Sequence, residues 1–104
     1  MNRANMQIAL EEKIEQTRLR VKDKKGLRDA VRVGIYAVGK RIFAVVDSTT
    51  GYEVKDGTLL PLTPEEYTKY IQPHNALQAS YEFKDIPTDG LNALTKLFEE
   101  VSKQ

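Results

Sequence analysis

Few residues in this chain could do chemistry, because it contains one histidine and no cysteine. His74 follows Pro73 at the expected end of a helix, and no motif supplies the partner that would orient it as a catalytic base. Zinc needs three or four His, Cys or carboxylate ligands close together, and one histidine among dispersed acids does not offer them. The sequence therefore predicts no catalytic residue, no metal site and no cofactor, and it favours a non-enzymatic function.

A carboxylate-x-lysine pattern, which resembles the signature of metal-dependent nucleases, occurs twice on expected strands. The two copies are Glu53-Val54-Lys55 and Glu82-Phe83-Lys84. The same pattern also occurs on the first expected helix, at Glu11-Glu12-Lys13 and Asp23-Lys24-Lys25. A chain with 30% charged residues produces such repeats by chance, so we interpret the pattern as background.

Charge is unevenly divided along the chain. Residues 1–41 contain 11 basic and 5 acidic side chains, whereas residues 42–104 contain 5 basic and 10 acidic ones. A basic cluster on a helix can neutralise phosphates and bind nucleic acid with strong salt dependence. Alternatively, the cations complement the helix dipole or pair with the acidic C-terminal half. The basic segment, residues 18–32, contains Arg18, Arg20, Lys22, Lys24, Lys25, Arg28 and Arg32.

Gly39-Lys40 predicts the register of a central hairpin, because a leading glycine suits a two-residue type II′ turn. Opposed residue numbers then add up to 79, which makes one face of the hairpin apolar. The other face places Tyr36 opposite Phe43. The predicted cross-strand pairs are Val33 with Val46, Ile35 with Ala44, Ala37 with Ile42, Tyr36 with Phe43, and Arg32 with Asp47.

The face with Tyr36 and Phe43 is a candidate binding surface, with Arg32 and Arg41 beside the two rings. Aromatic rings interleaved with arginine can stack single-stranded bases. The other interpretations are that a helix covers this face, with the N-terminal helix as the first choice, or that it contacts a partner or a second copy.

The remaining elements follow from periodicity and capping signals. A helix over about residues 5–25 has a narrow apolar stripe and a glycine cap, and a later helix begins at the Thr63-Pro64 cap with Glu66 three residues on. Asp56-Gly57 predicts a second tight hairpin. The apolar stripe of the first helix consists of Met6, Leu10, Ile14, Thr17 and Val21. The last helix is expected over residues 91–101. The expected strands cover residues 31–38, 41–47, 52–55, 58–60 and 77–84.

These elements predict a single α+β domain over residues 1–104: an N-terminal helix, a four-stranded antiparallel meander, a helix, a fifth strand and a C-terminal helix. No stretch approaches the roughly 18 apolar residues that span a membrane, and we expect a cytoplasmic protein. The leading hypothesis is a protein-binding adaptor, regulator or inhibitor that uses a sheet face or the basic helix end, with another protein or a copy of itself as partner. The alternative is a nucleic-acid-binding protein that uses the basic segment with Tyr36 and Phe43.

Overall fold

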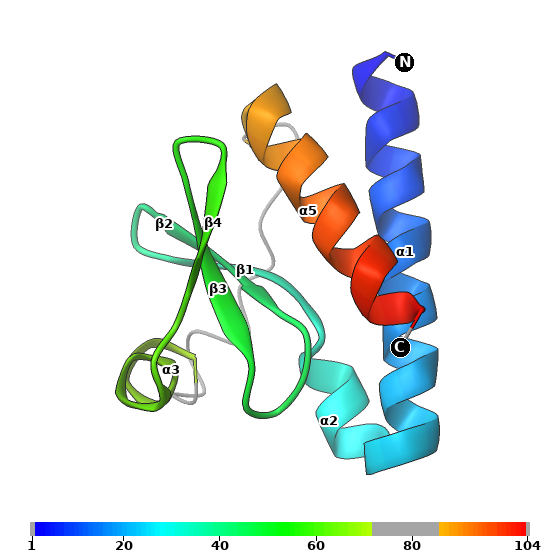
Figure 1. The fold of residues 1–104 in the computed structure, drawn as a ribbon, viewed down its shortest axis with the longest axis vertical. Helices are drawn as coiled ribbons and strands as arrows, with labels where there is room; N and C mark the ends of the chain where they lie inside the picture. Colours follow the sequence, from blue (N-terminus) through cyan, green and yellow to red (C-terminus); the bar gives the residue numbers. More distant parts are fainter. Residues whose placement is uncertain (1, 72–85, 104) are drawn as a thin grey trace.

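The computed structural model describes residues 2–71 and 86–103 and has an α+β fold, as predicted (Figure 1). Its four strands form one antiparallel sheet in the order β1-β2-β3-β4. The fifth strand predicted over residues 77–84 lies outside the described residues, and so does His74. The elements are α1 (Arg3–Lys25), α2 (Leu27–Arg32), β1 (Gly34–Val38), β2 (Arg41–Val45), β3 (Gly51–Lys55), β4 (Thr58–Pro61), α3 (Pro64–Tyr70) and α5 (Thr88–Ser102).

Helix α1 forms as the apolar stripe predicted. The side chain of Asn2 caps its first turn by accepting a hydrogen bond from the backbone N–H of Asn5 at 2.9 Å. Gly26 ends the helix at a φ of 110°, a positive value that suits glycine. The stripe faces inward, since Leu10, Ile14, Thr17 and Val21 are buried and Met6 packs against the same core.

The strand predicted to begin at residue 31 is wrong, because Val31 and Arg32 belong to the short helix α2. Gly26 ends α1 and also accepts the first bond of α2, from the N–H of Ala30 at 3.2 Å. Burial of Ala30 holds α2 in place, whereas Val31 is exposed. The sheet therefore begins only at Gly34, and the predicted pairs Arg32 with Asp47 and Val33 with Val46 lie outside the ladder.

Within the ladder, the predicted register is confirmed. Tyr36 pairs with Phe43, with Ile35 opposite Ala44 and Ala37 opposite Ile42. Gly39 has a φ of 63° and Lys40 has no positive φ, which agrees with a type II′ turn. At the next hairpin Asp56 and Gly57 have φ values of 52° and 75°, the pattern of the predicted type I′ turn.

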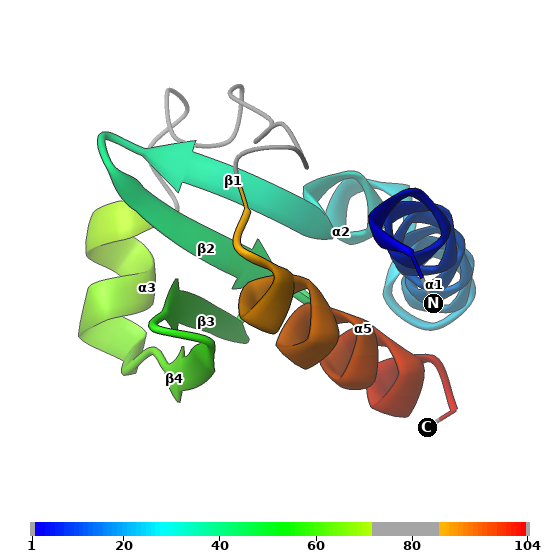
Figure 2. The ribbon, with the colours of Figure 1, turned by 90° about the horizontal axis from the view of Figure 1, so that it is seen from above.

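The sheet is covered by helices on both faces. Helices α1 and α5 lie side by side on one side of the strands, and α3 lies on the other (Figures 1 and 2). The larger core joins the first face of the sheet to α1 and α5, and its fully buried members include Leu10, Leu91, Leu94 and Phe98.

The second core lies between the sheet and α3, which corrects the expectation that the N-terminal helix covers the Tyr36 face. It contains Tyr36, Phe43, Val45, Tyr67 and Ile71. The predicted capping box of α3 is present: Thr63 accepts from the N–H of Glu66, whose side chain accepts from the N–H of Thr63.

Candidate functional site

The predicted stacking platform on the sheet is closed to ligands. Phe43 is completely buried and Tyr36 is only 7% exposed. The ring of Phe43 stacks on that of Tyr70 from α3, with centroids 5.6 Å apart and 21° between the planes. Helix α3 occupies this face of the sheet, so neither ring is accessible for a base to stack on in this structure.

Arg41, the cation predicted beside the two rings, has its charge engaged within the protein. Its Nε and one terminal nitrogen donate to the two carboxylate oxygens of Glu53, each at 2.8 Å. Its guanidinium lies 4.2 Å from the ring centroid of Tyr70 and 5.2 Å from that of Phe43. Arg41 lowers the pKa of Glu53 by these hydrogen bonds, and it lowers the pKa of Tyr70 as well. Arg41 thus links the sheet to α3 rather than offering a free charge.

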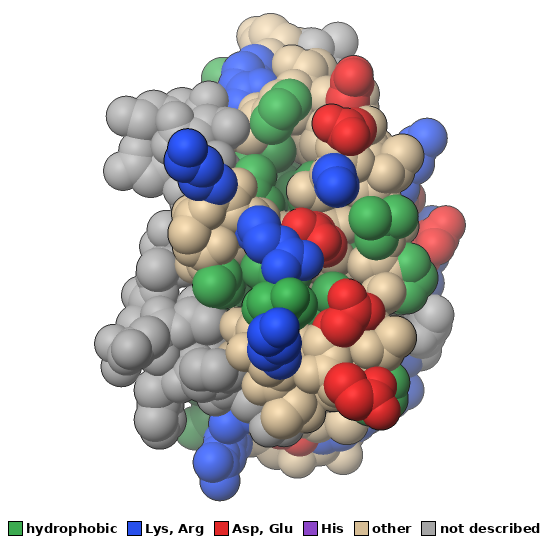
Figure 3. Space-filling view, turned by 90° about the vertical axis from the view of Figure 1, so that its left-hand side faces the viewer, with side chains coloured by type: hydrophobic (Ala, Val, Ile, Leu, Met, Phe, Trp, Pro, Cys, Tyr) green, Lys and Arg blue, Asp and Glu red, His purple; other side chains and the backbone are tan. Residues whose placement is uncertain are grey.

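The part of the strand side that is drawn in colour in Figure 3 has no broad patch of one charge or of apolar side chains. On the part of it drawn in colour, Lys and Arg alternate with Asp and Glu around small hydrophobic patches (Figure 3). Such mixed surfaces are typical of solvated faces. The other predicted surface is the basic helix end.

Three of the predicted basic residues hold the fold together. Arg20 on α1 donates to the backbone oxygen of Val101 in the last turn of α5. Lys25 pairs with Asp47 at 3.1 Å, and Arg18 donates from Nε to the backbone oxygen of Val33 at 2.8 Å. The Lys25–Asp47 pair agrees with the alternative in which cations of this segment pair with the acidic C-terminal half, whereas Arg18 and Arg20 bond to backbone oxygens instead.

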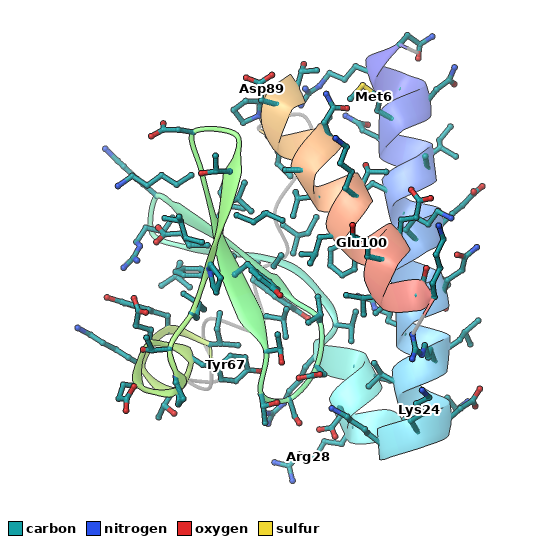
Figure 4. The ribbon with its side chains drawn as sticks, in the orientation of Figure 1. Met6, Lys24, Arg28, Tyr67, Asp89 and Glu100 are labelled. Atoms are coloured by element: carbon teal, nitrogen blue, oxygen red, sulfur yellow. The ribbon has the colours of Figure 1, made fainter. Side chains whose placement is uncertain are left out.

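The other basic residues reach solvent to different degrees. Lys22, Lys24 and Arg28 are exposed, and Lys22 and Arg28 form no ion pair or hydrogen bond with any described residue. Arg28 extends from α2 away from the body of the protein (Figure 4). Arg32 is half-buried, and its charge moderates the burial-raised pKa values of Tyr36 and Tyr67. The predicted site residues therefore do not form one site.

A groove between α1 and α2 brings Lys22 together with apolar surface. Three large apolar side chains line it and remain exposed: Leu19 at 54%, Leu27 at 62% and Val31 at 65%. The small side chain of Ala30 is buried at its base. The groove has a volume of about 400 Å³, and its charged lining residues are Glu15, Arg18 and Lys22. We call it the α1–α2 groove.

The position of α2 against α1 is fixed by the contacts already described. The Arg18 guanidinium reaches from α1 to the backbone oxygen of Val33, the residue that follows α2. At the other end, the N–H of Gly26 bonds to carbonyl oxygens of Val21 and Lys22. Both walls of the groove are therefore tied by backbone interactions.

The apolar residues of the groove were missed in the sequence because residue 31 was assigned to a strand. On a strand, Val31 alternates with Val33 and Ile35 and faces the core. On a helix, Leu27 and Val31 are four residues apart and share one side. The glycine cap at Gly26, followed by Leu27 four residues before Val31, was the signal that favours the helix.

No group of three or more His, Cys, Asp or Glu side chains that could hold a metal ion occurs within residues 2–71 and 86–103. Among the helices that the structure describes, none combines the length and the apolar character needed to cross a membrane.

Comparison of the chain with protein-family models, with curated proteins and with solved structures finds no match. The α1–α2 groove therefore has to be interpreted from its own geometry and charge.

Proposed function

We propose that this protein is a non-enzymatic protein-binding module, acting as an adaptor, regulator or inhibitor, whose partner docks in the α1–α2 groove. The observation on which the proposal rests is the gathering of three exposed apolar side chains, Leu19, Leu27 and Val31, around one concave surface. Single exposed apolar residues are common on soluble proteins, but a contiguous patch with a polar rim is typical of an interaction site.

The energy available in the groove supports this proposal. Each of the three side chains leaves more than half of its surface accessible. Because complete burial of Leu or Val stabilises by about 1.5–3 kcal/mol, covering the exposed part contributes about 1–2 kcal/mol per side chain. Three such contacts, on two helices whose relative position is fixed by hydrogen bonds, can form the apolar centre of a modest protein–protein interface.

Nucleic-acid binding is the second candidate function, supported by the exposed side chains of Lys22 and Arg28. They lie in the basic segment, whose seven basic and two acidic residues give a net charge of +5. Phosphate contacts alone would give non-specific, salt-dependent binding. The burial of Tyr36 and Phe43 removes the rings that this candidate needed for base stacking.

Affinity capture with matched surface variants tests the proposal. Leu19→Ser removes one wall residue of the groove, and Ile8→Ser is its control because Ile8 lies on the same helix and is 55% exposed. We expect a protein from the native lysate to be retained by the wild type and by Ile8→Ser after nuclease treatment, and to be lost with Leu19→Ser. Equal retention by both variants would contradict docking in the groove, and loss after nuclease treatment would favour the nucleic-acid function.

A further inference from the structure

The α1–α2 groove is unevenly charged along its length. Glu15 and Lys22, both lining residues, lie seven positions apart on α1, which corresponds to about 10 Å along the helix. Between them, the Arg18 guanidinium lies 3.9 Å from the Glu15 carboxylate, and the negative charge of Glu15 partly balances the positive charge of Arg18. Lys22 forms no ion pair with a described residue. One end of the groove therefore presents an unbalanced positive charge beside the apolar wall.

The surroundings of the Lys22 end add to this positive charge. Arg28, which forms no ion pair with a described residue, lies on α2 near the last turn of α1 (Figure 4). The basic segment has a net charge of +5, and two of its cations are paired with acids outside it, Lys25 with Asp47 and Arg18 with Glu15. A partner with negative charge at this end would associate faster, and the opposite charges would orient it along the groove.

The shape of the groove fits a helix better than an extended segment. Its two walls are helices, and Leu27 and Val31 are one turn apart on the shorter wall. Ala30 at the base lets a bulky side chain approach closely. Ridges of side chains spaced three or four residues apart pack into the groove between two helices, and peptides that bind in this way place apolar anchors at every third or fourth position.

We propose that the occupant of the α1–α2 groove is an acidic amphipathic helix of a partner protein, an inference that rests on the proposed function. Its apolar side chains contact Leu19, Leu27 and Val31. Its Asp and Glu side chains flank Lys22, and the opposite end, beside Glu15, accepts neutral or basic residues.

Two other occupants, a second copy of the chain and a nucleic acid, match this groove less well. A symmetric dimer in which the Lys22 ends of the two grooves meet would bring like charges against each other, and this opposes association. A nucleic acid would bring phosphates against three exposed apolar side chains that offer them no hydrogen bond. The combination of an apolar centre with a basic end is best matched by an apolar helix face with acidic flanks.

A displayed library of amphipathic helices tests this inference on the whole protein. The apolar positions of the library vary among Leu, Ile, Val, Met and Phe at spacings of three and four, and the flanking positions are randomised. Selection is run on the wild type and on Ile8→Ser, Leu19→Ser and Lys22→Glu, each first checked for a native circular dichroism spectrum. Selected helices are then measured as peptides by fluorescence anisotropy at low and high salt.

We expect the wild type and Ile8→Ser to select helices enriched in Asp and Glu at one end. Leu19→Ser should weaken their binding by about tenfold, the loss expected when an exposed leucine no longer contacts an apolar partner. Lys22→Glu should lower the affinity for the acidic helices by about three- to tenfold and should itself select basic flanks.

Three results would overturn the inference. Selected helices that show no preference for Asp and Glu, or whose binding is unaffected by Lys22→Glu, would refute the acidic partner. The proposed function would still stand if a lysate protein were retained by the other variants and lost only with Leu19→Ser. Displacement of the peptides by a single-stranded oligonucleotide would assign the basic end to nucleic acid. A concentration-dependent dimer in light scattering that disappears with Leu19→Ser would assign the groove to a second copy.

Discussion

The pH dependence of unfolding at Tyr67 tests how α3 covers the sheet. The Tyr67 side chain is 3% exposed, and its hydroxyl donates to the backbone oxygen of Asp47 at 2.9 Å. Burial raises the pKa of Tyr67 to about 12, against the 10.0 of an unperturbed tyrosine, although the charge of Arg32 opposes this rise. Between these two values the folded chain keeps a proton that the unfolded chain has lost.

The sign and size of the effect follow directly. Stability from Tyr67 is fully present below pH 10 and is lost as the pH rises toward 12, because the unfolded state then binds fewer protons. The free energy of unfolding should fall by about 1.4 kcal/mol per pH unit over this interval, up to about 2–3 kcal/mol in total. Tyr67→Phe should cost about 1 kcal/mol at neutral pH, for the lost hydrogen bond, and should unfold with a shallower alkaline slope.

Urea unfolding of the wild type, Tyr67→Phe and Tyr70→Phe at a series of alkaline pH values measures these slopes. Tyr70 is the matched control, since hydrogen bonding and the charge of Arg41 lower its pKa. Its contribution is present above pH 10 and is lost as the pH falls through the lowered pKa, so Tyr70→Phe should change the slope in the opposite direction. Identical alkaline slopes for the wild type and Tyr67→Phe would refute the burial of this hydroxyl under α3.

Three further predictions concern the elements that support the fold. Glu53→Gln should lower the free energy of unfolding by about 1 kcal/mol at neutral pH, because it removes the ion pair with Arg41. It should also flatten the loss of stability below pH 4.5, because Arg41 lowers the pKa of Glu53 and the stabilisation of the wild type is lost as the pH falls. Urea unfolding midpoints across the acidic range measure both effects. Gly57→Ala should cost more than about 1 kcal/mol in thermal unfolding, because φ is 75° and the new Cβ would lie 2.8 Å from Cβ of Asp89. Thr63→Ala should cost about 1 kcal/mol in urea unfolding, since it removes the cap of α3.

Local rules predicted the elements whose geometry is decided by a few neighbouring residues. The two-residue turn at Gly39-Lys40 fixes every pair of the first hairpin, so the pairing of Tyr36 with Phe43 followed from the sequence. The capping box at Thr63 is equally local. In both cases the backbone has one low-energy solution within four residues.

Which helix covers which sheet face depends on tertiary packing, and the expectation that the N-terminal helix covers Tyr36 was wrong. Both α1 and α3 have an apolar side, and either could cover Tyr36 by periodicity alone. The length of the connection determines which helix covers Tyr36. Because α3 begins three residues after β4 ends at Pro61, the connecting segment is too short for α3 to pack on the opposite face of the sheet. Leu62 then packs against the smaller core, which contains Tyr67.

The α1–α2 groove follows from apolar residues that the fold itself does not use. Helix α2 is held by the burial of Ala30 and by the backbone at Gly26, neither of which involves the side chains of Leu27 or Val31. A connection between α1 and β1 would be equally stable with polar residues at those two positions, because side chains more than 60% exposed contribute little to folding. Under the proposed function, contact with a partner explains their apolar character next to Leu19 and beside Lys22, which forms no ion pair with a described residue.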